Sequence, residues 1–229
     1  MRETIVDRTY AKTLLPPRKE DGHKGDFGKL LVLGGSMGYT GAPYLAASAA
    51  VHSGCGLVYL GVPESIWTVE AQKCVSAMPF PLPETDGRLC LAALDKMQDK
   101  LKGCDVLALG PGLGRGKETE QLVHALLWQV KEPLVLDADG LNALQGCTEK
   151  LDVRRGRVTI LTPHDGEFAR LTDRTLREIA SSERAALPAS TAVSWCSRGT
   201  GRALRCRTGG CSSTRAAARR SQRAGAGTC

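Results

Sequence analysis

The sequence lacks long apolar runs, an apolar N-terminus and paired cysteines. None of its apolar runs approaches the ~18 residues of a membrane span, so we expect no membrane partner. The first residues, 1–7, are mostly polar and do not form the apolar core of a signal peptide. The nine cysteines are scattered and never form a Cys-x-x-Cys pair, which argues against a zinc site or a disulfide framework. We therefore expect a protein of the reducing cytoplasm.

The positive charge of the chain is concentrated at one end. Residues 181–229 contain nine arginines, no lysine and one acidic residue, Glu183, so the net charge of this segment is +8. The formal net charge of the whole chain is +7. Residues 1–180 therefore carry −1 and are close to neutral. A basic domain would indicate nucleic-acid binding, but a neutral body with a basic end does not. We expect no nucleic-acid partner.

A glycine-rich loop between a strand and a helix organises the chain. The apolar run 29–33, bounded by glycine, predicts a buried strand, and Pro43 suits the first position of the helix that follows. The loop contains four glycines whose backbone can approach a ligand closely: Gly34, Gly35, Gly38 and Gly41. A loop that opens onto a helix N-terminus favours phosphates, although a plain tight turn would need the same residues.

Further strand-loop-helix units follow along the chain. Strands are predicted at 56–63, 105–109, 133–136 and 158–161, while the proline-containing stretch 64–100 predicts an irregular connection. This alternation indicates an α/β fold with a parallel central sheet flanked by helices. In such sheets ligands bind beyond the carboxyl ends of the strands, where the glycine-rich and acidic loops would meet. We predict a small-molecule site at that edge.

The loops after the later strands carry polar candidates. Gly110-Pro-Gly-Leu-Gly114 exposes backbone donors that suit phosphate, or it is a turn that needs glycine for its geometry. Of Asp137 and Asp139, one could help to hold Mg²⁺ through water, and one is expected to cap the next helix. Asn142 is expected to bond either a ligand or neighbouring backbone.

A lone histidine ends the last of these strands. Such a residue is more often structural than catalytic, but His164 stands beside Asp165, Gly166 and Glu167 at a helix start. This position favours contact with a ligand. Asp165 is expected to cap the helix rather than to take part in catalysis.

Five motifs together resemble one family. They are Lys24-Gly-Asp-Phe-Gly28, Gly34-Gly-Ser-Met-Gly-Tyr-Thr-Gly-Ala-Pro43, Gly110-Pro-Gly-Leu-Gly114, Asp137-Ala-Asp-Gly-Leu-Asn142 and Leu161-Thr-Pro-His-Asp-Gly-Glu-Phe168. In this order they resemble the ADP/ATP-dependent NAD(P)H-hydrate dehydratases, over roughly residues 10–175. The resemblance implies a ribokinase-like fold with three α/β/α layers and, for this chain, no epimerase domain of the kind that precedes many family members.

The resemblance implies a lyase that repairs damaged nicotinamide nucleotides. The family uses ADP or ATP, with Mg²⁺, to make the hydroxyl of hydrated NADH or NADPH (NADHX or NADPHX) a leaving group, and elimination restores the coenzyme. By this resemblance Ala42, Gly112 and His164 would contact the hydrated dinucleotide. Nine further residues would support the site: Gly34, Gly35, Gly41, Gly110, Gly114, Asp137, Asp139, Asn142 and Glu167. We also expect a homo-oligomer.

The sequence departs from the family pattern near its C-terminus. The family continues with a strand that ends Val-Leu-Lys-Gly and a Gly-Ser-Gly-Asp loop, which binds the nucleotide phosphates and supplies the key aspartate. The written sequence contains no match to them, so neither a catalytic residue nor a metal ligand is identified. Residues 181–229 have little aliphatic content and a bias to Arg, Ala, Ser, Gly and Cys, which cannot bury a core.

A shifted reading frame accounts for this departure. When the codons of Trp195-Cys-Ser-Arg-Gly199 are regrouped by one base, they are compatible with Val-Leu-Lys-Gly, and residues 221–229 are compatible with Ala-Thr-Gly-Gly-Ser-Gly-Asp-Val. We hypothesise a frameshift between about Leu171 and Val193. The predicted segments are an N-terminal arm (1–26), a truncated dehydratase domain (27–180) that lacks the C-terminal part of the fold, and an out-of-frame, disordered tail (181–229). A natural basic tail is the alternative.

Two other functions fit the same loops. A ribokinase-like kinase of a vitamin precursor would share the fold and the phosphate-binding loops. A protein that holds a dinucleotide without chemistry would share the binding edge. The motifs at 34–43 and 162–168 favour the dehydratase.

Overall fold

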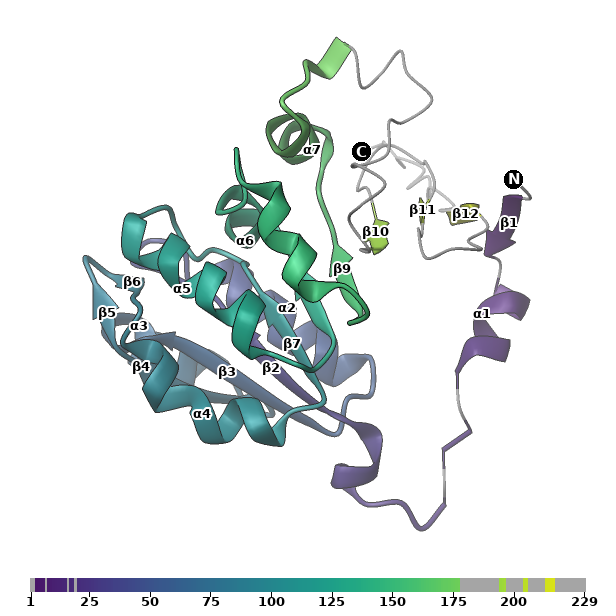
Figure 1. Ribbon diagram of the computed structural model, residues 1–229. Helices are drawn as coiled ribbons and strands as arrows, with labels where there is room; N and C mark the ends of the chain where they lie inside the picture. Colours follow the sequence, from purple (N-terminus) through teal and green to yellow (C-terminus); the bar gives the residue numbers. More distant parts are fainter. Residues whose placement is uncertain are drawn as a thin grey trace, which may run out of the picture.

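The computed structural model describes residues 3–6, 8–15, 17–18, 20–177, 194–196, 204–205 and 213–216, and its body is a layered α/β structure (Figure 1). The central strands are β2 (Lys29–Leu33), β3 (Leu57–Pro63), β4 (Met78–Leu82), β7 (Val106–Leu109), β8 (Leu134–Leu136) and β9 (Thr159–Leu161). The helices around them are α2 (Gly41–His52), α3 (Glu64–Lys73), α4 (Ala93–Gly103), α5 (Lys117–Gln129), α6 (Ala138–Asn142) and α7 (Asp165–Thr172).

Six strands form a parallel sheet in the order β9-β8-β7-β2-β3-β4. The chain starts in the middle of this sheet at β2, builds outward through β3 and β4, and then returns to add β7, β8 and β9 on the other side of β2. This reversal places the loops after β2 and β7 next to each other. A ligand site at the carboxyl edge of such a sheet is favoured at the reversal.

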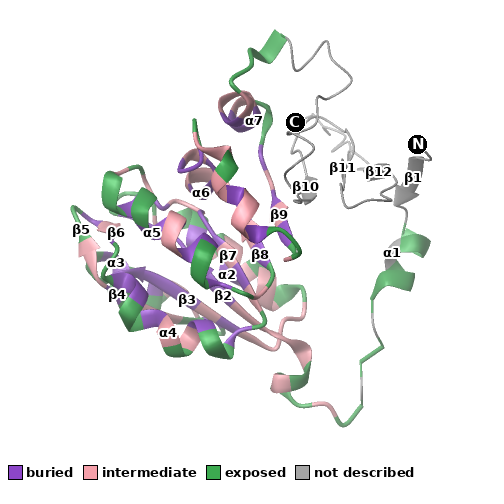
Figure 2. Ribbon diagram, viewed as in Figure 1, coloured by how far each residue is buried: buried purple, intermediate pink, exposed green. Residues whose placement is uncertain are grey.

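Alternating side chains of the strands feed two apolar layers, one on each face of the sheet. Leu31 and Leu33 of β2 pack with α4 and α5, whereas Val32 between them packs with α2 and α3. Figure 2 shows these strands as the buried centre and the outer faces of the helices as exposed. The α/β/α layers and the parallel sheet that the sequence predicts are confirmed.

The stretch 64–100 is more regular than the sequence predicts. It contains α3, β4 and α4 together with a small hairpin, β5 (Glu84–Thr85) and β6 (Arg88–Leu89). The prediction was wrong because prolines are tolerated in β4, the edge strand of the parallel sheet, where no further strand needs their N–H groups. Two helix starts also differ: α2 begins at Gly41, before Pro43, and α6 occupies the acidic loop itself.

Short elements complete the described chain. They are β1 (Glu3–Val6), α1 (Arg8–Leu14), the 3₁₀ turns η1 (Lys24–Phe27) and η2 (Thr148–Arg154), β10 (Ser194–Cys196), β11 (Leu204–Arg205) and β12 (Ser213–Ala216). β10 pairs in parallel with β9, β11 lies antiparallel between β10 and β12, and β1 pairs in parallel with β12. Most of the segment 181–229, for which the sequence predicts disorder, lies outside the described residues.

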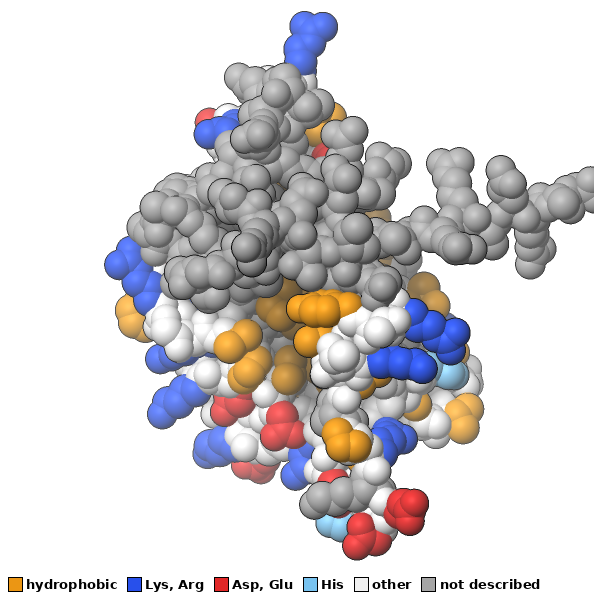
Figure 3. All heavy atoms as spheres, turned by 90° about the vertical axis from the view of Figure 1, so that its right-hand side faces the viewer, with side chains coloured by type: hydrophobic (Ala, Val, Ile, Leu, Met, Phe, Trp, Pro, Cys, Tyr) orange, Lys and Arg blue, Asp and Glu red, His pale blue; other side chains and the backbone are white. Residues whose placement is uncertain are grey.

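Two surface properties bear on partners. Among the described residues, no helix has the length and apolar character needed to cross a membrane. On the face of the molecule that Figure 3 shows, described Lys and Arg side chains are interspersed with Asp and Glu and do not form one continuous basic patch.

Candidate functional site

The loops after β2 and β7 are hydrogen-bonded to each other at the carboxyl edge of the sheet. The N–H of Gly35 donates to the carbonyl of Pro111 at 2.9 Å, and the Ser36 hydroxyl donates to the carbonyl of Gly112 at 2.8 Å. Ser36 is only 3% exposed, so this second bond is shielded from water. The glycine-rich loop and the Gly110–Gly114 loop therefore form one connected surface.

The same edge continues through the loops after β8 and β9. The N–H of Gly114 donates to Oδ2 of Asp139 at 3.0 Å, which joins the β7 loop to α6. The Thr162 hydroxyl donates to Oδ1 of Asp137 at 2.7 Å, which joins the β9 loop to the end of β8. The structure thus brings all four predicted loops together along one edge of the sheet.

Close backbone contact explains two of the predicted glycines. A Cβ on Gly110, whose φ is +130°, would lie 1.8 Å from the carbonyl oxygen of Asp137. A Cβ on Gly34 would lie 2.4 Å from the carbonyl oxygen of Pro111. Neighbouring loops approach each other so closely that only glycine fits. The sequence left open whether Gly110 serves phosphate binding or a turn that needs glycine. The structure shows that the backbone geometry at Gly110 requires glycine.

The residues expected to contact the dinucleotide lie in three of these loops. Ala42 is exposed in the first turn of α2. Gly112 lies against the end of the glycine-rich loop, because a Cβ there would be 3.0 Å from the Tyr39 carbonyl oxygen and 3.5 Å from Pro43. His164 follows β9, two strands further along the sheet. Gly112 therefore lies close to the loop and helix start that contain Ala42, whereas His164 lies further along the edge.

His164, and not Asp165, caps α7. Its Nδ1 accepts the N–H of Gly166 at 3.0 Å and that of Glu167 at 3.4 Å, while the Glu167 carboxylate accepts the His164 N–H at 2.9 Å. This reciprocal arrangement is a capping box. The prediction for Asp165 was wrong because Asp165 is already the first helical residue, one position after the cap. The sequence signal was present, since Glu167 stands three residues after His164.

The capping role leads to a test of stability. Replacement of His164 by Ala is expected to lower the free energy of unfolding by about 1 kcal/mol, because two helical N–H groups lose their acceptor. Replacement by Asn keeps a capping acceptor and is expected to cost less. Urea unfolding of both variants provides the comparison. Equal losses for Ala and Asn would contradict a capping role for the ring.

Asp139 and Asn142 connect the edge to α7. Oδ1 of Asp139 accepts the Asn142 side-chain amide at 3.0 Å, and Oδ1 of Asn142 accepts Nε of Arg170 at 3.1 Å. Asp137 holds the N-cap position of α6 without a side-chain cap bond, so neither aspartate caps this helix through its side chain. Arg170 was missed because its partner lies 28 positions earlier, beyond the range of local sequence patterns.

The described residues do not provide a ready metal centre. No group of three or more His, Cys, Asp or Glu side chains among them is arranged to hold a metal ion. Asp139 instead accepts bonds from Gly114 and Asn142, and Arg115 lies 3.9 Å from its Oδ1. These contacts favour a structural role for the carboxylate over direct metal binding.

A cavity of about 480 Å³ lies beside this edge, between α5 and the region of α6. Its lining includes Gly114, Asp139 and Asn142 of the predicted site and adds Arg115, which the sequence prediction missed. Ala42, Gly112 and His164 do not line it. Cys147 also borders the cavity, and burial, followed by the charge of Glu149, raises the pKa of its thiol. The thiol therefore remains protonated at neutral pH and is a poor nucleophile.

The layered sheet and its loop edge define a ribokinase-like protein. A ribokinase-like superfamily protein from Enterococcus faecalis has a TM-score of 0.74 at 18% identity, with 94% of this chain and 72% of that one covered. An ADP/ATP-dependent NAD(P)H-hydrate dehydratase from Bacillus subtilis has a TM-score of 0.69 at 25% identity, with 92% of this chain and 72% of that one covered.

A family model described as NAD(P)H-hydrate dehydratase matches residues 30–194, and the chain belongs to that family. A bifunctional NAD(P)H-hydrate repair enzyme from Moorella thermoacetica is 43% identical over 192 residues, which are 83% of this chain and 36% of that protein. An ADP-dependent (S)-NAD(P)H-hydrate dehydratase from Neisseria meningitidis is 37% identical over 172 residues, 74% of this chain and 54% of that protein. The chain thus spans about a third of the first relative and about half of the second.

Proposed function

We propose that this chain carries the domain of an ADP-dependent (S)-NAD(P)H-hydrate dehydratase, a lyase that returns NADHX and NADPHX to NADH and NADPH. The observation that carries the proposal is the hydrogen-bonded row of four loops at the carboxyl edge of β2, β7, β8 and β9. All four lie inside the segment that matches the family. ATP in place of ADP is the finer alternative, since relatives of both kinds are named.

The proposed binding roles come from the resemblance to the family. Ala42, Gly112 and His164 would contact the hydrated dinucleotide, whose diphosphate suits the start of α2, where no side chain caps the helix. The bonds from Gly114 to Asp139 and from Thr162 to Asp137 support a role for Gly114, Asp137 and Asp139 in holding the loops in register.

ADP and Mg²⁺ enter as co-substrate and cofactor. When the nucleotide is bound, its phosphates would turn the hydroxyl of the damaged nicotinamide ring into a leaving group. Among the described side chains, no group of three or more His, Cys, Asp or Glu is arranged to hold the metal. A cytoplasmic setting, supported by the scattered cysteines, and the absence of a nucleic-acid partner, supported by the near-neutral charge of residues 1–180, are part of the proposal, as is a homo-oligomer.

The segment 181–229 belongs to the same proposal. We infer that the reading frame shifts between about Leu171 and Val193, so that the Gly-Ser-Gly-Asp loop of the family is not produced in this translation. The domain boundaries at residues 26 and 180 rest on composition and motifs. The family match covers residues 30–194, so it begins just after the first boundary and runs past the second, and it ends before most of the arginine-rich segment.

Turnover of the hydrated dinucleotide tests the function and the frame together. The polypeptide as written is expected to show little or no ADP-dependent recovery of reduced-nicotinamide absorbance from NADPHX. The product of a gene with the frame restored is expected to show clear recovery. An inactive frame-restored protein would contradict the function. Equal activity of the two proteins would contradict the frameshift, as would DNA sequencing that finds one uninterrupted frame.

A further inference from the structure

A lysine at the end of α3 is bonded to the last residue of the glycine-rich loop. Nζ of Lys73 donates to Oγ1 of Thr40 at 2.6 Å and to the carbonyl oxygen of Thr40 at 3.2 Å. Its third bond goes to Oε1 of Glu70 at 3.1 Å, within the same helix. An ammonium group has three protons, so these bonds use its full donor capacity. Two of the three bonds of Lys73 therefore go to Thr40, 33 positions earlier in the chain.

Glu70 holds this lysine in place. Its side chain is fully buried, a costly position for a carboxylate unless an opposite charge is close. Burial raises the pKa of Glu70, while the hydrogen bond and the charge of Lys73 act in the opposite direction. Among the described residues Oε2 has no hydrogen-bond partner, so the carboxylate is directed at Lys73 alone. Lys73 also lies in the last turn of α3, where the helix dipole favours a cation.

The loop segment that Lys73 reaches is held at Met37, whose N–H donates to the carbonyl of Gly87 at 2.8 Å, but its large side chains point to solvent. Met37 and Tyr39 are exposed large side chains, at 64% and 65%. A Cβ built on Gly38 or on Gly41 would meet no heavy atom of the structure within 4 Å. The start of the loop, by contrast, is bonded to the β7 loop through Gly35 and Ser36. Among the described residues, the side-chain hydrogen bonds to Thr40 come from Lys73.

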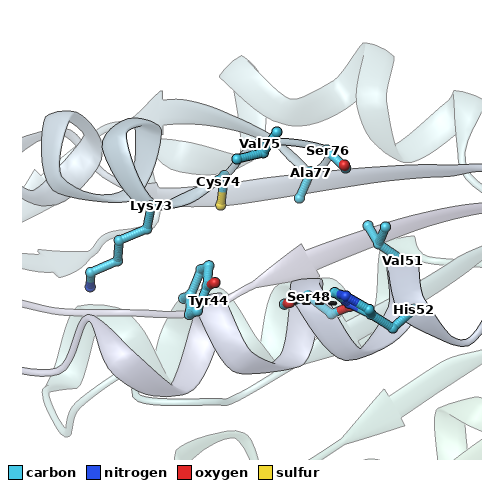
Figure 4. A pocket seen from close by; sticks show the side chains of 9 residues that line it. All are labelled: Tyr44, Ser48, Val51, His52, Lys73, Cys74, Val75, Ser76 and Ala77. Atoms are coloured by element: carbon cyan, nitrogen blue, oxygen red, sulfur yellow. Dashed lines mark hydrogen bonds between the residues drawn. The ribbon is translucent and has the colours of Figure 1, made fainter.

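A cavity separates α2 from the segment that follows α3, and Lys73 is one of the residues that line it. Figure 4 shows Lys73 extending from the end of α3 toward the start of α2, while Ser48, Val51 and His52 of α2 lie across from the segment 74–77. The cavity has a volume of about 250 Å³. The Lys73 side chain lines this cavity and reaches from α3 to Thr40 of the glycine-rich loop.

We propose that Lys73, oriented by Glu70, is a positioning residue that fixes Thr40 and thereby the backbone of Gly41 and Ala42 for dinucleotide binding. The assignment of Ala42 to the dinucleotide rests on the proposed function, whereas the fixing of the loop does not. Because Lys73 donates its three protons to Thr40 and Glu70, its effect is on loop order and affinity.

The experiment combines hydrogen exchange with binding of NADPH to the full chain. Replacement of Lys73 alone leaves the Glu70 carboxylate buried and unpaired, so the informative variant is Glu70→Gln with Lys73→Met, which removes both charges. Amides in a peptide covering 34–44 are expected to exchange at least 10-fold faster than in the parent. Calorimetry is expected to show about 10-fold weaker binding of NADPH. Lys102→Met, an exposed lysine in the last turn of α4, controls for loss of charge.

A second variant separates the loop contact from the buried pair. Thr40→Val removes the hydroxyl acceptor and keeps Glu70 and Lys73, and it is expected to accelerate exchange in 34–44 less than the double variant. Thr40→Ser is expected to restore protection. Unchanged exchange in both the double variant and Thr40→Val would overturn the positioning role. If exchange accelerates but the parent binds no NADPH, the loop contact is upheld and the proposed function fails.

Discussion

Replacement of Arg154 by Leu is expected to lower the free energy of unfolding by about 3 kcal/mol, because it leaves buried acceptors without a donor. Arg154 is fully buried in η2. Its guanidinium donates to the carbonyls of Val130, Glu132 and Val158 and to the Thr159 hydroxyl oxygen. It thereby joins the end of α5 to the starts of β8 and β9. Burial, with a smaller effect of Arg157, lowers the pKa of Arg154, and the carbonyl dipoles compensate for the lost water.

The size of this effect depends on which acceptors find other donors. The Val130 carbonyl keeps a bond from Arg157, and the Val158 carbonyl keeps one from the Leu134 N–H. The Glu132 carbonyl and the volume of the lost side chain account for most of the expected loss. Urea unfolding measures it. Arg155→Leu is the matched control, because its side chain is 56% exposed and pairs only with Asp152 among the described contacts. A loss no larger than that of the control would contradict this account.

Replacement of Gly110 by Ala is expected to cost at least about 3 kcal/mol of stability and to disturb the whole loop edge. The new Cβ would lie 1.8 Å from the carbonyl oxygen of Asp137 and 2.8 Å from its carbon. Both are main-chain atoms, so no side-chain rotation relieves the clash. The Asp137 N–H bond to the Leu109 carbonyl, 3.0 Å long, joins β8 to β7 at this point and would lengthen.

A matched glycine separates the clash from the unfavourable φ angle. Gly146 has a φ of +73°, but a Cβ on it meets no heavy atom within 4 Å. Gly146→Ala is therefore expected to cost about 1–2 kcal/mol, the usual cost of placing alanine in the left-handed region. Thermal or urea unfolding of the two variants gives the difference. Similar losses at Gly110 and Gly146 would mean that the β7 and β8 loops are not held in close backbone contact.

The fold was largely predictable because its signals are local. Short apolar runs identified β2, β3, β7, β8 and β9. The edge strand β4 and helix α3 were not identified. β4 contains prolines, and α3 presents few buried residues, Ile66 and Glu70, so its apolar periodicity is weak. Edge position, which allows proline in a strand, is a tertiary property and is not visible in the sequence.

The site was predictable in its loops but not in its internal bonds. Glycine and acid at strand ends indicated one shared edge, and the structure confirms that the loops meet there. The pairs Asn142–Arg170 and Thr40–Lys73 join residues about 30 positions apart, so no local pattern reveals them. The cap of α7 was assigned one residue too late, because an aspartate directly follows the histidine that performs the role. Ligand contact by Ala42, Gly112 and His164 stays a prediction.

The cap at α7 limits how the His164 ring can meet any molecule. Since Nδ1 accepts backbone N–H groups, the ring proton of the neutral form belongs on Nε2. That nitrogen lies 3.2 Å from Oε1 of Glu167. A ligand that accepts a hydrogen bond from Nε2 would have to replace the Glu167 carboxylate as the acceptor, so the number of hydrogen bonds would not increase. The imidazole would then contribute orientation more than tightness, and it would accept only molecules that offer an oxygen or nitrogen lone pair from the solvent side.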